Sequence, residues 1–116
     1  MTHEDMTNAL SMAGLISFID QSKDGLDTVI GTSQTRFNLG FRKRLALARA
    51  SLINGMLVIM DEPTEGLDSE GARIFYNFLN DRIKQNRTVV VLSHDPAIIK
   101  GANTVIDLDK LQKNLE

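Results

Sequence analysis

Hydrophobic residues recur at helical intervals in the first half of the chain and form short continuous runs in the second half. Met6, Leu10 and Ala13 share one predicted helical face, and Thr2 precedes them as a residue that can cap a helix. A second helical pattern begins near Gly40 and places four apolar residues on one face: Phe41, Leu45, Ala48 and Leu52. The pattern therefore predicts helices on both sides of an irregular stretch.

The segment Leu57–Glu62 contains four apolar residues followed by two carboxylates, and it predicts a buried strand of a parallel sheet. Thr88–Leu92 and Thr104–Leu108 are two further strand candidates, and a broad apolar helical pattern separates the first two strands. Alternation of strand, helix and strand predicts parallel pairing with crossover helices. The predicted fold class is α/β, with parallel strands, flanking helices and a small helical part before them.

Composition narrows the classes of protein to which the chain can belong. With 116 residues, 42% of them hydrophobic, the chain is long enough for one domain with a core. A net charge of −2 gives no electrostatic case for a nucleic-acid partner. The absence of cysteine excludes disulfides and thiolate metal sites, and it suits a reducing compartment. No apolar run approaches the roughly 20 residues of a membrane span, so we expect a soluble chain.

Acidic residues and a histidine follow the predicted strands at their carboxyl ends. Asp61 and Glu62 end the first strand, Asp68 follows in a loop, and His94 follows the second strand. Ligands of open α/β sheets bind beyond these strand ends, where one carboxylate can hold a hydrated metal and another can polarise a water. The alternative without a ligand site is that Leu57–Glu62 is a core strand followed by a helix cap and that His94 has a structural role. The convergence of the strand ends on one rim favours a hydrolytic site.

Taken together, these segments resemble the nucleotide-binding domain of ABC transporter ATPases. Four segments, which occur in the family's order and spacing, carry the resemblance: Arg42–Ala50, Leu57–Glu62, Pro63–Asp68 and Ser93-His94. The resemblance covers the chain from about Thr2 to Lys110. It implies that Asp61, at the end of the Walker B strand, holds magnesium through water, that Glu62 is the catalytic glutamate, and that His94 is the switch histidine. Gly66–Asp68 resembles the D-loop.

The P-loop of the family is missing from this sequence. Its pattern, G-x-x-x-x-G-K-[ST], requires glycines five residues apart followed by lysine and a hydroxyl residue. Only Gly66 and Gly71 have that spacing, and Ala72-Arg73 follows them. The chain therefore resembles the C-terminal piece of a partial P-loop NTPase sheet. We expect residues 1–36 to form the helical subdomain with its connecting loop, and residues 37–116 to form the signature helix and the C-terminal α/β part of the ATPase core.

The signature motif of the family, LSGGQ, aligns with Phe37-Asn38-Leu39-Gly40-Phe41 and is degenerate here. In the family this segment lies at a helix N-terminus and grips the γ-phosphate of ATP bound by the opposite subunit. Leu39 replaces a glycine and would crowd the phosphate, and Phe41 replaces a glutamine and donates no hydrogen bond. The nucleotide-contacting positions that the resemblance implies are Asn38, Leu39, Gly40 and Asp68.

The resemblance implies an ATP-binding and ATP-hydrolysing segment of an ABC transporter that powers export at the cytoplasmic face of a membrane. The implied cofactors are ATP and Mg²⁺, and we expect the 116 residues alone to bind neither tightly and to be inactive. The implied partners are a second nucleotide-binding domain and the transmembrane domains, with no nucleic acid. Residues Asp61–Asp68 read DEPTEGLD, which leans toward exporters and type I secretion ATPases. A nucleotide-free dimerisation or docking module, and an ABC ATPase outside transport, are the alternatives.

Missing strands have a structural consequence as well. A parallel sheet without its N-terminal strands is expected to leave an apolar surface and an unpaired edge exposed. We therefore expect marginal stability or self-association.

Overall fold

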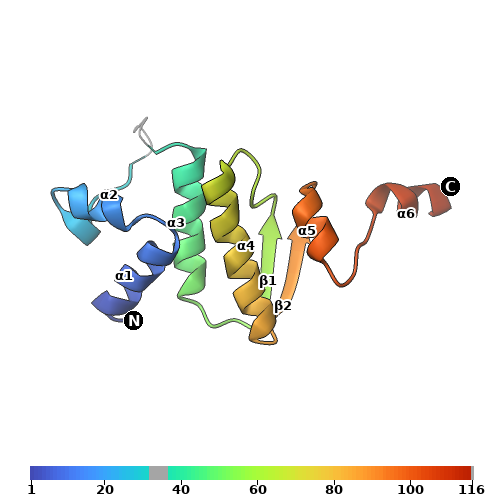
Figure 1. Cartoon of the computed structure of the whole chain (residues 1–116), viewed down its shortest axis with the longest axis horizontal. Helices are drawn as coiled ribbons and strands as arrows, with labels where there is room; N and C mark the ends of the chain where they lie inside the picture. Colours follow the sequence, from blue (N-terminus) through green and yellow to red (C-terminus); the bar gives the residue numbers. More distant parts are fainter. Residues whose placement is uncertain (32–36, 116) are drawn as a thin grey trace.

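The computed structural model describes residues 1–31 and 37–115, in which helices lie beside a small parallel sheet (Figure 1). The elements before the sheet are α1 (His3–Met12), α2 (Ile16–Gln21), the 3-10 turn η1 (Gly25–Asp27) and α3 (Leu39–Ser51). The elements that build and follow the sheet are β1 (Leu57–Asp61), α4 (Ser69–Lys84), β2 (Thr88–Leu92), α5 (Pro96–Gly101) and α6 (Leu108–Leu115). None of the helices in these described ranges is long and apolar enough to cross a membrane.

Side-chain caps fix where the helices begin. The hydroxyl of Thr2 accepts the backbone N–H of Asp5 at 3.1 Å, and the carboxylate of Asp5 accepts the backbone N–H of Thr2 at 2.7 Å. This reciprocal capping box confirms the predicted start of α1. Asp68 caps α4 by a single bond, in which its carboxylate accepts the N–H of Gly71 at 2.8 Å. Gly14, with φ of 73°, turns the chain after α1.

Helix α3 lies between two hydrophobic clusters and contributes residues to both. Ala48 packs on one side against the α1–α2 part, whose buried residues are Ala9, Leu10, Ala13 and Leu15. Leu47, which is 2% exposed, packs on the other side against buried residues of α4: Ile74, Phe75, Phe78 and Leu79. Two neighbouring residues of α3 thus belong to different hydrophobic clusters on opposite sides of the helix. The predicted boundary between residues 1–36 and 37–116 falls at residues 32–36, outside the described part of the chain, and the division into domains stays a prediction.

The two strands pair in parallel, from Leu57 opposite Thr88 to Asp61 opposite Leu92, which confirms the predicted α/β class with parallel pairing. One face of this sheet packs toward α4 through Val58, Met60, Val89 and Val91. The other face is open, with Leu57 54%, Ile59 64%, Val90 46% and Leu92 50% exposed. The prediction of a buried first strand is therefore wrong for this face, because no described element covers it. The predicted exposed apolar surface is confirmed.

The predicted third strand at Thr104–Leu108 is also wrong. Val105 and Ile106 are 56% and 71% exposed, and α6 begins at Leu108. The carboxylate of Asp107 accepts the N–H groups of Asp109 at 3.1 Å and Lys110 at 3.3 Å. The backbone of an extended segment forms hydrogen bonds only with a neighbouring strand. Asp107 instead caps the backbone N–H groups of the next residues, and this cap favours the start of a helix.

Candidate functional site

The carboxyl ends of β1 and β2 bring Glu62 and His94 into contact. The N–H of Glu62 donates to the carbonyl of Leu92 at 2.8 Å, which extends the parallel pairing one residue beyond Asp61. Nδ1 of His94 lies 2.6 Å from Oε1 of Glu62. The two residues predicted to be catalytic therefore meet at one sheet edge, as the parallel arrangement of the strand ends predicted, while their catalytic roles stay predictions.

Glu62 has an unusual backbone conformation. Its φ is 44°, in the left-handed region that few residues other than glycine occupy. Such a conformation costs about 1–3 kcal/mol and persists where surrounding contacts hold it. Nζ of Lys43, on α3, donates to the carbonyls of Glu62 and Glu65, each at 2.7 Å. Two charge-assisted hydrogen bonds from another element thus hold the loop that presents the Glu62 carboxylate.

Asp61 lies at the end of β1 with an exposed side chain that forms no hydrogen bond or ion pair with the described residues. Mg²⁺ commonly takes one or two carboxylates from a protein and fills its remaining positions with water and substrate phosphates. The free carboxylate of Asp61 is sufficient for the single protein ligand that Mg²⁺ can accept. Residues 1–31 and 37–115 contain no group of three or more histidine or acidic side chains that could hold a metal by themselves. The metal-binding role of Asp61 stays a prediction.

The four predicted nucleotide-contacting residues lie elsewhere, in one depression of about 490 Å³ between the start of α3 and the loop before α4. Its lining includes Asn38, Leu39, Gly40 and Asp68. Oδ1 of Asn38 accepts the N–H of Phe41 at 2.9 Å and so caps α3. Leu39 packs over Gly66, where an added Cβ would lie 3.0 Å from Cδ2 of Leu39. Asp68 contacts Arg44 at 3.5 Å and lines this depression, and among the described residues it forms no hydrogen bond or ion pair with Glu62 or His94.

Two aromatic residues of the degenerate signature form a cluster with Phe18 of α2, which the sequence did not reveal. Phe41 lies 4.7 Å from Phe18 and 4.8 Å from Phe37, measured between ring centroids. Phe18 and Phe37 are 5.6 Å apart, and Phe37 is 6% exposed. These rings attach the start of α3 to α2. The sequence places Phe41 on the apolar face of this helix and marks it as the loss of a donor, but periodicity does not identify Phe18 and Phe37 as its partners.

Asp95 is a second residue whose role the sequence reasoning missed. Its Oδ2 accepts hydrogen bonds from Thr64 Oγ1 at 2.7 Å and Tyr76 OH at 2.5 Å. Its Oδ1 accepts the N–H of Ala97 at 2.9 Å and caps α5. The bonds from Thr64 and then Tyr76 lower the pKa of Asp95, whose carboxylate raises the pKa of Tyr76. Asp95 thus ties the loop after β1 to α4 and α5. The available signal was an aspartate just before Pro96, a typical helix start.

No family model matches the chain. The ATP-dependent lipid A-core flippase of Shewanella oneidensis is 36% identical over 110 residues, which cover 95% of this chain and 18% of the flippase. The flippase of Chromobacterium violaceum is 38% identical over 105 residues, covering 90% of this chain and 18% of that protein. The flippase of Haemophilus influenzae is 37% identical over 108 residues, covering 93% of this chain and 18% of that protein.

The chain therefore spans 18% of the length of these curated relatives, but the similarity extends over nearly all of its own length. The resemblance drawn from the sequence is confirmed: this chain is a relative of the C-terminal part of the nucleotide-binding domain of ABC exporters.

Proposed function

We propose that this segment supplies the water-activating part of an ATP-hydrolysing nucleotide-binding domain that drives an ABC exporter. The observation that carries the proposal is the 2.6 Å contact between His94 Nδ1 and Glu62 Oε1 at the carboxyl ends of two adjacent parallel strands. Open α/β sheets bind their ligands at this edge. The names of the flippase relatives, which state ATP dependence, support the same function.

Glu62 is the base in this proposal. Oε1 is engaged by His94, whereas Oε2 has no partner among the described residues, so Oε2 is the oxygen that can take a proton from an attacking water. An ionised carboxylate only accepts, so Nδ1 of His94 must carry the proton of this bond. In the neutral ring Nε2 is then an acceptor, and it donates to a phosphate only in the imidazolium form. In this proposal His94 orients Glu62 through this bond.

Asp61 would hold Mg²⁺ through water, and the ion when bound would neutralise charge on the transferred phosphoryl group. Asn38, Leu39, Gly40 and Asp68 would contact the nucleotide held by a second nucleotide-binding domain. Oδ1 of Asn38 is engaged as a cap and Leu39 covers Gly66, so the start of α3 offers backbone N–H groups more than side chains to a phosphate.

The proposed context is a dimer of nucleotide-binding domains attached to transmembrane domains, at the cytoplasmic face of a membrane. The proposed site belongs to a P-loop NTPase sheet whose P-loop lies outside this sequence. The names of the relatives support lipid export as the finer hypothesis for the whole transporter, and the DEPTEGLD loop supports type I secretion as its alternative.

The test is Glu62→Gln in the longer protein that joins this segment to a P-loop. Hydrolysis is expected to slow by about 10²–10⁴-fold, the usual scale for a catalytic base. Glu65→Gln is the matched control, because Glu65 lies in the same loop and only its backbone is engaged. A Glu62→Gln protein that hydrolyses ATP at the unsubstituted rate refutes the assignment.

A nucleotide-free docking module is the second candidate for the 116 residues taken alone, because their sequence contains no P-loop pattern. Calorimetric titration of the chain with Mg-ATP tests this candidate. We expect no tight binding by the chain alone. Tight binding would contradict both the docking module and the expectation that the missing P-loop is required.

A further inference from the structure

Lys43 connects the first turns of α3 to the loop after β1. The residue is half-buried, and its ammonium group donates to two backbone carbonyls, those of Glu62 and Glu65, each at 2.7 Å. Hydrogen bonds from a charged donor are shorter and stronger than neutral ones. The contact joins residues 19 and 22 positions apart in the sequence, so it is tertiary rather than local.

The two carbonyls belong to the turn that carries the proposed base. The N–H of Glu65 donates to the carbonyl of Glu62 at 3.3 Å, and the N–H of Leu67 donates to the carbonyl of Thr64 at 3.2 Å. The Glu62 carbonyl therefore accepts from two donors, while its φ of 44° places it in a sparsely populated conformation. Lys43 anchors both ends of this turn and restricts rotation of the Glu62 peptide.

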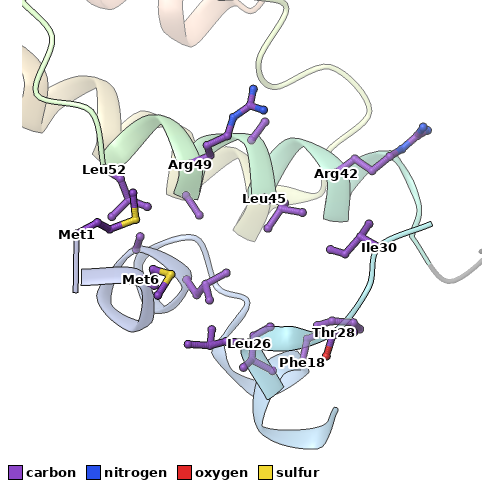
Figure 2. A pocket seen from close by; sticks show the side chains of 15 residues that line it. Met1, Met6, Phe18, Leu26, Thr28, Ile30, Arg42, Leu45, Arg49 and Leu52 are labelled. Atoms are coloured by element: carbon purple, nitrogen blue, oxygen red, sulfur yellow. The ribbon is translucent and has the colours of Figure 1, made fainter. Parts of the chain in front are cut away.

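The basic residues of α3 divide into two that are engaged and two that are free. Arg44, whose side chain is 18% exposed, contacts Asp68 at 3.5 Å, and Lys43 grips the turn beside it. Arg42 and Arg49 form no hydrogen bond or ion pair with any residue in the described ranges. Figure 2 shows both extending from α3 beside the apolar cavity that α3 shares with α1 and α2. Arg49 therefore provides a matched control on the same helix.

We propose that Lys43 is a positioning residue that holds Glu62 where its carboxylate meets His94. Lys43 lies on α3 about one turn after Gly40. A displacement of Asn38–Gly40 would therefore move Lys43 and, through it, the carboxylate of Glu62. The catalytic consequence rests on the function proposed above, whereas the restraint on the turn does not. In a dimer of such domains, Lys43 would link the segment that contacts one nucleotide to the base that serves the other.

Amide hydrogen exchange on the 116-residue chain tests the restraint. Lys43→Met removes the ammonium group and keeps the aliphatic stem. Exchange at Glu65 and Leu67 is expected to rise about tenfold in this variant, since the turn loses its tertiary anchor. Exchange at Leu10 in α1 is expected to stay unchanged, and Arg49→Met is expected to match the unsubstituted chain at all three amides. Lys43→Arg, which keeps the charge and several donors, is expected to restore much of the protection.

Two outcomes overturn the restraint. In one, exchange at Glu65 and Leu67 in Lys43→Met equals that of the unsubstituted chain. In the other, exchange rises by the same factor in α1, which would show general destabilisation instead of a local anchor.

Steady-state kinetics on the longer protein that includes a P-loop tests the catalytic consequence. Lys43→Met is expected to lower kcat by about 10–10²-fold with KM for ATP unchanged, because a misplaced base affects the chemical step and not substrate binding. Arg49→Met is expected to leave both constants unchanged, and Lys43→Arg to recover part of the rate. If Glu62→Gln slows hydrolysis but Lys43→Met does not, the positioning role is refuted. If Glu62→Gln has no effect, the proposed function fails while the exchange result still stands or falls separately.

Discussion

Replacing Ile59 and Val90 together by threonine tests how the chain covers the open face of its sheet. The two residues lie opposite each other in the parallel pairing and are 64% and 46% exposed. Threonine keeps the β-branched shape that suits a strand but adds a hydroxyl that favours water. The substitution therefore changes the polarity of the open face while leaving the face that packs on α4 unaltered.

The size of the effect follows from the remaining exposure of the open face. Its four apolar side chains are each about half exposed: Leu57, Ile59, Val90 and Leu92. Full burial of such a side chain contributes about 1.5–3 kcal/mol, so covering the exposed half of all four yields roughly 3–6 kcal/mol per copy. Two copies gain roughly 6–12 kcal/mol, against about 4–15 kcal/mol for lost freedom on association. The difference is favourable by at most about 8 kcal/mol, which sets about 1 μM as the tightest Kd, and we expect weak self-association with Kd between that limit and the millimolar range.

Sedimentation velocity over about 10–500 μM protein spans the upper part of that range and measures the association. The unsubstituted chain is expected to shift toward larger species with rising concentration, and the double variant is expected to remain monomeric because it loses about half of the gain. Val29→Thr is the control, since Val29 is 78% exposed but lies outside the sheet. A monomer at every concentration in the unsubstituted chain, or an equal loss of association in Val29→Thr, would refute the reasoning.

Three further predictions concern contacts that the sequence did not reveal. Thr64→Val and Tyr76→Phe are each expected to lower the free energy of unfolding by about 1–2 kcal/mol in urea denaturation, the range for a partly exposed bond to a carboxylate. These bonds lower the pKa of Asp95 in the folded chain. Its contribution to the free energy of unfolding is therefore fully present above the unfolded pKa near 3.9, and it is lost as the pH falls through the lower folded pKa. Asp95→Asn is expected to weaken this loss of stability at acid pH. Phe41→Gln restores the family's residue, yet it should destabilise the chain by about 1–2 kcal/mol through lost aromatic packing, and an equally stable variant would contradict that role.

Features that depend on local chemistry or on strand direction could be predicted from the sequence. The Thr2 cap needs only a hydroxyl three residues before an N–H group, and the structure confirms it. The meeting of Glu62 and His94 needs only two parallel strands with side chains just beyond their carboxyl ends. The segment Thr104–Leu108 failed because a strand exists only where a partner strand can accept its hydrogen bonds, and apolar content does not report that partner.

The contacts of long polar side chains could not be predicted, because periodicity gives a face and not a distant partner. The sequence marks Asp95 only as an aspartate before Pro96, whereas its bonds to Thr64 and Tyr76 span 31 and 19 residues. The basic run of α3, Arg42 to Arg44 with Arg49, has a charge pattern that is typical of a solvated helix face. That interpretation holds for Arg42 and Arg49 and is wrong for Lys43, which is bonded to the turn after β1.

The angular position of each basic residue around α3 explains this division. Successive residues of an α-helix are rotated by about 100°, so Lys43 and Arg44 lie on either side of the direction of Leu47. Leu47 faces the cluster with α4, and the turn after β1 lies on that same side. Arg42 and Arg49 are seven residues apart and share a direction with the cavity toward α1 and α2. Basic residues that flank the buried face of a helix can thus become tertiary anchors while others in the same run stay solvated. Identification of Leu47 as the buried position is sufficient to separate the two kinds.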